Sequence, residues 1–182
     1  ATFQVIVAAD GNYHDTVTFD MALARPIENF ETGNFASFPW QFTGSQPWTT
    51  VTSAPYEGSY CAQSGAITHS QSSGMSVNLS VQSDGTVSFY YKVSSEPNWD
   101  LLKFSIDGQV KGQWSGSVAW TQSTYQVAAG NHTFLWQYSK DGSMSQGSDR
   151  AWVDLIAFPP VQSVVTPLEI VTATVPDGWV GL

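Results

Sequence analysis

Hydrophobic and polar residues alternate in short runs along most of this chain. The clearest run, residues 75–81, reads Met-Ser-Val-Asn-Leu-Ser-Val. A period of two residues is typical of a strand with one buried face. Further strands are expected at 86–92, 101–106, 110–114, 132–138 and 151–158. Turn residues separate the runs, and the Asp107-Gly108 pair between two of them predicts a tight hairpin.

This pattern predicts an all-β fold, an antiparallel jelly-roll β-sandwich spanning residues 27–159, because many short strands with frequent turns are typical of that class. The pattern of residues 1–26 predicts a separate hairpin, with a turn at Asp-Gly-Asn between two runs of alternating hydrophobic and polar residues. Residues 160–182 carry three prolines around a short apolar run, as a linker and the start of a following module would. Both flanks are therefore expected to be portions of neighbouring modules or linkers.

The composition of the chain narrows the classes of partner that it can have. The chain has 6 Lys+Arg against 15 Asp+Glu, a net charge of −9. Such a surface repels phosphate backbones and anionic lipid, so no nucleic-acid partner is expected. No apolar run approaches the roughly 20 residues that a membrane-spanning helix needs, so no membrane insertion is expected. Few lysines and many serines and threonines favour an extracellular location. The one cysteine, Cys61, cannot form an internal disulfide, and its role is left open.

Catalytic motifs are missing from the sequence. It contains no Gly-x-Ser-x-Gly, His-Glu-x-x-His or phosphate-binding loop signature. The three histidines are far apart, and His132 is expected to be structural. Sandwich glycosidases use two carboxylates on facing strands, but no such pair is identified by spacing here. We therefore expect a chain that is not an enzyme, with a glycan-acting enzyme as the less favoured alternative.

A Ca²⁺ site is a stronger possibility. Ca²⁺ takes several oxygen ligands, and candidates lie in the segments 28–31 and 56–59 and at Asp154. Asp154 alternates with apolar residues in the last strand, where a carboxylate needs a partner to offset its desolvation. An ion pair with Arg150, or exposure at a sheet edge, would explain Asp154 equally well.

Aromatic residues in turns suggest a ligand surface, because sugar rings stack on Trp and Tyr while carboxylates and amides bind the hydroxyl groups. Trp99 stands in a Pro-Asn-Trp-Asp loop that offers no apolar partner. The residues expected to contact a ligand are Trp99, Trp114, Trp48 and Asp100. Most tryptophans pack in cores, and that is the expectation for Trp136 and Trp152, which lie in strands.

Several motifs together resemble the cleaved-adhesin domains of gingipain-type bacterial proteases. The opening segment 27–33 reads Ile-Glu-Asn-Phe-Glu-Thr-Gly, and the segment 151–154 reads Ala-Trp-Val-Asp. The other matching segments are 38–40, 47–48, 56–60, 94–96, 102–108, 114–116 and 138–141. The resemblance covers roughly residues 27–159, and MAM domains and several carbohydrate-binding modules look like more distant relatives.

The resemblance implies an extracellular jelly roll that sits beside other modules and often carries structural calcium. It places the calcium ligands on Glu31, on Glu57 or Gly58, and on Asp154. Asn29 departs from the family, in which an aspartate is common at that position, and this weakens the metal assignment. Residues 1–24 are similar to the end of an immunoglobulin-like module.

The function expected from these observations is a non-catalytic binding module of a secreted or cell-surface bacterial protein with several domains, either a protease or a polysaccharide-degrading enzyme. Its partners would be a polysaccharide or the glycan of a glycoprotein, a host or matrix protein, and neighbouring domains of the same parent chain. The alternative is a structural accessory or spacer domain that stabilises a neighbouring catalytic domain and has no ligand of its own.

Overall fold

The computed structural model describes residues 2–9, 13–20 and 25–161. All regular secondary structure within these ranges is β-strand, and they include no helix of the length and apolarity needed to cross a bilayer. The strands are β1 (Thr2–Ala9), β2 (Tyr13–Asp20), β3 (Ile27–Glu28), β4 (Gln41–Gly44), β5 (Thr49–Val51), β6 (Cys61–Gln63), β7 (Ser72–Val81), β8 (Gly85–Ser94), β9 (Leu101–Ile106), β10 (Gln109–Trp114), β11 (Ser117–Val127), β12 (Gly130–Ser139) and β13 (Arg150–Ala157).

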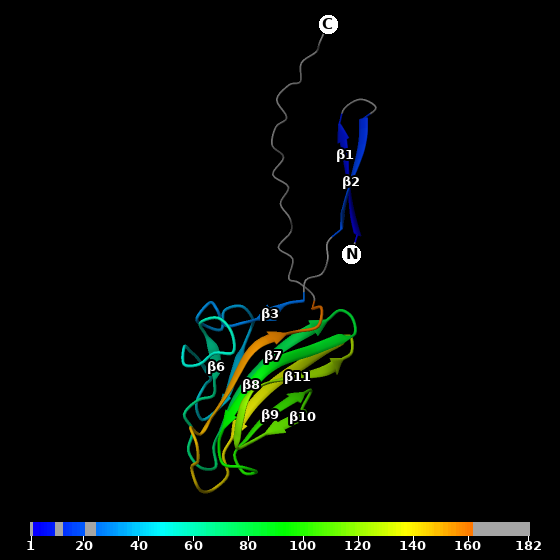
Figure 1. The fold of residues 1–182 in the computed structure, drawn as a ribbon. Coiled ribbons are helices and arrows are strands. Elements are labelled where there is room, and N and C mark those ends of the chain that lie inside the picture. Colours follow the sequence, from blue (N-terminus) through cyan, green and yellow to red (C-terminus); the bar gives the residue numbers. More distant parts are fainter. Residues whose placement is uncertain (1, 10–12, 21–24, 162–182) are drawn as a thin grey trace.

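Two antiparallel sheets make up the sandwich (Figure 1). One has the strand order β10-β9-β12-β7-β4, and the other has the order β11-β8-β13-β6-β5, with β3 paired to β13. From β7 onward the chain crosses between the sheets at every connection except the β9–β10 hairpin. The all-β sandwich predicted from the alternating pattern is confirmed.

Alternation along the long strands builds the interior. On β8 every second residue from Val87 to Val93 is buried, and the residues between them face outward. Phe89 of β8 meets two rings of the opposite sheet, with centroid distances of 4.7 Å to Phe104 and 5.2 Å to Trp136. Aromatic pairs at such distances add specific attraction to the burial of their large apolar surfaces. The two sheets are therefore joined through aromatic contacts at the centre of the sandwich.

The β9–β10 hairpin has the two-residue turn that its sequence predicts. Ile106 pairs with Gln109, and both turn residues have positive φ, 52° for Asp107 and 76° for Gly108. This conformation matches the twist of the flanking strands and favours Asp-Gly sequences. The Asp107 carboxylate also accepts hydrogen bonds from the Thr133 backbone N–H at 2.8 Å and from Nδ1 of His132 at 2.7 Å. The turn is thereby fixed to the neighbouring strand β12.

The first and last strands of the sandwich lie side by side. Ile27 pairs with Ala157, and the Phe158 backbone N–H donates to the Pro26 carbonyl at 2.9 Å. The chain therefore begins and completes the sandwich at the same end.

Residues 1–26 contain the expected hairpin, in which β1 and β2 pair from Thr2 opposite Asp20 to Ala9 opposite Tyr13. The assignment of this segment to a preceding module stays a prediction. The expected linker and following module at 160–182 lie almost entirely outside the described residues, the last of which is Val161.

Replacing Phe104 by alanine should lower the free energy of unfolding by about 3–5 kcal/mol, because the side chain is fully buried among aromatic rings and leaves a cavity. Urea unfolding followed by tryptophan fluorescence measures the change. Val110→Ala on the adjacent strand is the control, since Val110 is exposed and its loss should cost less than about 0.5 kcal/mol. Equal effects of the two substitutions would contradict the central position of Phe104.

Candidate functional site

An open groove of about 520 Å³ lies on the outward face of the β11-β8-β13 sheet. Its walls come from neighbouring strands and from the loops that precede β6 and β13. The lining residues are Ser53, Ala54, Lys92, Val93, Ser94, Ser117, Val118, Ala119, Ser148 and Trp152. Four serine hydroxyls and one ammonium group in one hollow provide both donors and acceptors of hydrogen bonds.

Trp152 and Lys92 form the floor of this groove. They are opposite each other on β13 and β8, and the Lys92 ammonium lies 4.8 Å from the centroid of the indole ring. The indole N–H of Trp152 is buried and has no hydrogen-bond partner among the described residues. A buried donor without a partner costs free energy, which makes Trp152 an unusual residue for the floor of a groove.

The loop 52–60 covers part of the same sheet face through aromatic contacts. Tyr56 stacks on Tyr90 of β8, with ring centroids 3.5 Å apart. The indole N–H of Trp120 donates to the carbonyl of Ala54 at 3.1 Å. The loop therefore has a defined position beside the groove.

Trp99 is the predicted ligand contact that the structure leaves available. Its side chain is 61% exposed, on the loop that connects β8 to β9. The loop is attached to the turn before β11 by a hydrogen bond of 2.8 Å from the Asn98 backbone N–H to Oγ of Ser115. Trp114 lies beside this turn and is half-buried, with one ring face stacked on Tyr91 at a centroid distance of 4.0 Å.

Two of the predicted ligand contacts are wrong. Trp48 is buried in the core and donates its indole N–H to the carbonyl of Ser73 at 3.1 Å, so no ring face is left for a ligand. Asp100 is fully buried and pairs with Nζ of Lys140 at 2.7 Å. Turn residues flank Trp48 and Trp99 alike, and only the fold separates the buried ring from the exposed one.

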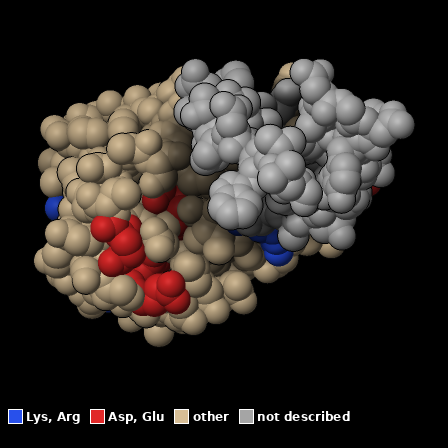
Figure 2. Space-filling view, turned by 90° about the horizontal axis from the view of Figure 1, so that it is seen from above, with Lys and Arg blue, Asp and Glu red and all other residues tan. Residues whose placement is uncertain are grey.

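The predicted metal ligands come together around the loop 56–60, although they are distant in sequence. The Asp154 carboxylate accepts the backbone N–H groups of Tyr56 and Glu57, at 2.9 and 3.3 Å. The Glu31 carboxylate accepts those of Ser59 and Tyr60, each at 2.9 Å. From above, acidic side chains are seen gathered on one part of the sandwich surface (Figure 2).

Asp154 is positioned by an irregularity of β13. The register shifts between Asp154 and Ala157, and Leu155 between them has a positive φ of 46°. The pKa of the fully buried Asp154 carboxyl is raised to about 6, mainly by desolvation and to a smaller degree by the charge of Glu31, against the lowering effect of three backbone N–H bonds. The ion pair with Arg150 and the edge exposure, both open from the sequence, are not found: the described residues give Asp154 no ion pair, and its strand lies inside the sheet.

Glu57 and Gly58, two of the predicted metal ligands, contact the Asp154 and Glu31 carboxylates through their backbone and not through side chains. The Glu57 side chain is exposed, and the residue meets Asp154 only through its N–H group. A Cβ atom on Gly58 would lie 2.4 Å from Oε1 of Glu31, and the φ of Gly58 is +64°. Glycine is therefore required at this position for the close approach of the Glu31 carboxylate.

Sequence reasoning missed two residues of the groove, Lys92 and Trp152. Lys92 was not singled out because nothing in the sequence distinguishes it from any other lysine in a strand. Trp152 was assigned to the core because its strand is apolar. Glu28, which lies in the candidate segment 28–31, is fully buried and accepts the indole N–H of Trp40 at 3.0 Å. Only the inward or outward direction of each residue, set by strand register, could have identified them.

No protein-family model and no curated protein matches the sequence. Solved structures do match it in fold. The K1 cleaved-adhesin domain of Lys-gingipain from Porphyromonas gingivalis W83 is similar with a TM-score of 0.55 and 14% identity, over 73% of this chain and 96% of that domain. The CBM22-1 xylan-binding domain of Xyn10C from Paenibacillus barcinonensis is similar with a TM-score of 0.51 and 18% identity, over 75% of this chain and 96% of that domain.

The secreted serine protease VesC from Vibrio cholerae matches with a TM-score of 0.57 and 21% identity, over 81% of this chain but 30% of the protease chain. At such identities these likenesses show a shared fold. The resemblance to cleaved-adhesin domains and carbohydrate-binding modules indicated by the sequence motifs is thus supported at the level of fold.

Cys61 should be nearly inert to alkylation in the folded protein. It is fully buried, and desolvation, reinforced by the charge of Asp154, raises the pKa of its thiol to about 12. Because the thiolate is the reacting form, iodoacetamide should label native protein at neutral pH roughly 1,000-fold more slowly than protein unfolded in urea. Mass spectrometry over time measures both rates, with Cys61→Ser as the background control. Similar rates in the two states would contradict the burial of the thiol.

Proposed function

We propose that this chain is a non-catalytic module that binds glycans, within a secreted bacterial protein of several domains such as a protease or a polysaccharide-degrading enzyme. The observation that carries the proposal is the groove on the β11-β8-β13 face, where four serines, Lys92 and Trp152 line one hollow. Sugars present many hydroxyl groups that both donate and accept hydrogen bonds, which suits such a lining.

Trp99 extends this surface. The groove residue Ser94 is the last residue of β8, and the loop that follows it carries Trp99. The groove residue Ser117 is the first residue of β11, and it follows the turn to which the Trp99 loop is hydrogen-bonded. An exposed indole on the loop that follows Ser94 would offer an apolar face to a sugar ring while the groove binds hydroxyl groups. Solved structures of the same fold include a xylan-binding domain and a domain in complex with β-1,4-galactotriose, which supports a carbohydrate as ligand.

A calcium ion is part of the proposal, at Glu31 and Asp154. Their carboxylates hold the same loop, and neither is in an ion pair among the described residues. The residues fit the ion in donor type, because Ca²⁺ prefers carboxylate oxygens. They also fit it in charge, because a cation would offset the desolvation that chiefly raises the pKa of Asp154 and the smaller repulsion from Glu31. When bound there, Ca²⁺ would neutralise this repulsion and help hold the loop 56–60.

Affinity electrophoresis through plant, algal and bacterial polysaccharides tests glycan binding. We expect one class of polymer to retard the chain, and Trp152→Phe, which keeps an aromatic ring but removes the indole N–H, to weaken the retardation roughly tenfold, equivalent to about 1.4 kcal/mol. Phe42→Ala, an exposed ring on β4 of the other sheet, is the control. Migration unaffected by every polymer would favour the spacer function instead.

Trp99→Ala should weaken the same binding without lowering stability. The side chain is mostly exposed, so its removal loses a stacking surface but leaves no cavity. Thermal unfolding and affinity electrophoresis of the same preparation separate the two effects. A fall in melting temperature that parallels the loss of binding would show instead that Trp99 packs against the fold.

Calcium should raise the melting temperature. A ligand that binds only the folded state stabilises it by about 2.7 kcal/mol at a 100-fold excess over Kd. Differential scanning calorimetry with Ca²⁺ and with chelator measures the shift, and Glu31→Gln should reduce it. An identical melt with Ca²⁺ and with chelator would refute this part of the proposal while leaving glycan binding open.

A further inference from the structure

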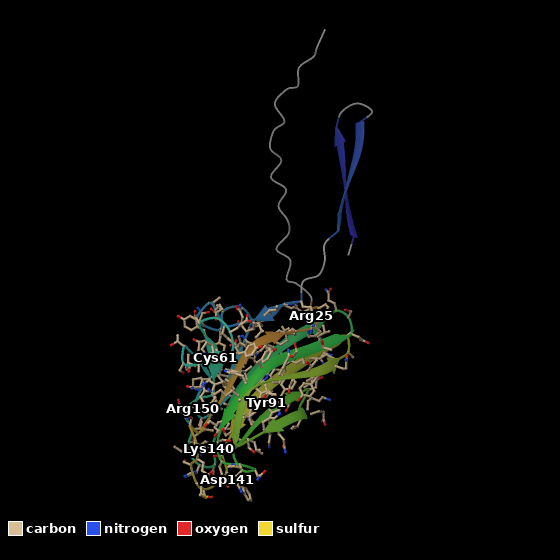
Figure 3. The ribbon with its side chains drawn as sticks, viewed as in Figure 1. Arg25, Cys61, Tyr91, Lys140, Asp141 and Arg150 are labelled. Carbon is tan, nitrogen blue, oxygen red and sulfur yellow. The ribbon has the colours of Figure 1, made fainter. Side chains whose placement is uncertain are left out.

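A second group of carboxylates lies at the other end of the sandwich. Glu96 and Asp100 come from the loop between β8 and β9, and Asp141 comes from the loop between β12 and β13. One carboxylate oxygen from each residue lies within 4.8 Å of the others. Lys140 and Asp141 are near the end of the molecule opposite Arg25, and Cys61, a neighbour of Asp154, lies well apart from them (Figure 3). The two carboxylate groups are therefore separate.

The local charges do not balance. The buried Lys140 ammonium pairs with Asp100 and with Asp149, at 2.7 Å in each case. This one cation is shared by two carboxylates, while Glu96 and Asp141 have no ion pair within the described part of the chain. Four carboxylates and one ammonium leave an excess of three negative charges when all are ionised. Burying uncompensated charge is costly, so the arrangement favours an additional cation.

The lack of balancing positive charge is clearest at Glu96. The residue is 7% exposed, and its buried Oε2 atom has no hydrogen-bond partner among the described residues. Desolvation raises the pKa of Glu96, and the charges of Asp141 and Asp100 raise it further. By contrast, the Asp100 carboxylate accepts the Asp141 backbone N–H at 3.0 Å as well as the Lys140 ammonium. Glu96 is thus a buried carboxylate directed at other carboxylates, with no donor of its own.

We propose that Glu96, Asp100 and Asp141 bind a Ca²⁺ ion at this end of the sandwich. With Ca²⁺–oxygen distances of about 2.3–2.6 Å, two ligand oxygens can lie up to roughly 5 Å apart, which accommodates the observed spacing. Water and backbone carbonyls would complete the six to eight oxygens that Ca²⁺ takes. The ion would join the loop before β9 to the loop before β13. It would also fix the loop that carries Trp99, since that residue lies between two of the ligands.

Isothermal titration of the full chain with Ca²⁺ tests the proposal, after chelator has been used and removed. Glu96→Gln and Asp141→Asn each remove one ligand charge with little change of shape. Each should weaken Ca²⁺ binding at one site by at least roughly tenfold, the lower end of the effects seen when metal sites lose supporting groups. Glu31→Gln removes a ligand of the other proposed site. Asp84→Asn is the matched control, an exposed carboxylate at the opposite end of β8.

The variants distinguish the two calcium sites. Loss of one site in Glu96→Gln and in Asp141→Asn, with Asp84→Asn unchanged and the remaining site sensitive to Glu31→Gln, supports the inference. The inference also stands if the unsubstituted chain binds one ion that Glu96→Gln removes and Glu31→Gln does not. It is overturned if Glu96→Gln and Asp141→Asn both bind as many ions as the unsubstituted chain, or if that chain binds none. Circular dichroism confirms that each variant is folded, and Asp141, which is only half-buried, provides the result if Glu96→Gln fails to fold.

Discussion

The loops of this protein depend on carboxylates that are satisfied largely by backbone N–H groups. With 6 Lys+Arg against 15 Asp+Glu, there are too few cations to pair with every acid. Asp154 and Glu31 instead hold the loop 56–60 through its amides, and Glu28 holds the segment that follows it. Such charge-assisted bonds are stronger than neutral ones and fix the direction of the backbone. The loops next to the sandwich therefore gain definite conformations without helices or disulfides.

The two proposed calcium sites and the proposed glycan groove lie in different parts of the structure. The groove lies on a rigid sheet face, where strand register sets the spacing of Lys92 and Trp152. Apart from Asp154 of β13, the carboxylates of the two proposed calcium sites lie outside the strands, where backbone amides take part in fixing the chain. Trp99 belongs to both regions, because its loop borders the groove and contains Glu96 and Asp100. The proposed binding surface would combine a floor formed by the sheet with a rim held in place by a bound ion.

The fold was predictable from the sequence because period-two patterns are local, as in β7 and β8, and Asp-Gly turns have a known backbone conformation. The edge strand β11 gave no comparable signal, since most of its residues are polar and exposed. The sites were predictable only in part. The motifs predicted that Asp154 lies near the loop at 56–57. In contrast, the Lys140–Asp100 pair joins residues 40 positions apart, on two different loops that each connect the two sheets. Burial of Trp48 likewise depends on packing that no neighbouring residue reveals.

The pairing of β3 with β13 determines how the module responds to mechanical tension. Pro26 and Phe158 are joined by a hydrogen bond at one end of the sandwich, so a force transmitted along a parent chain would arrive and leave at adjacent points. Pulling there separates an antiparallel pair one bond at a time, beginning with the two residues of β3, and does not shear the long strands. On the exit side, the Val81–Val161 bridge and the hydrogen bond from the Gln82 backbone N–H to the Pro160 carbonyl would also have to open before the force reached the long strands. A module attached in this way would therefore begin to open at this end, where the chain enters and leaves the sandwich.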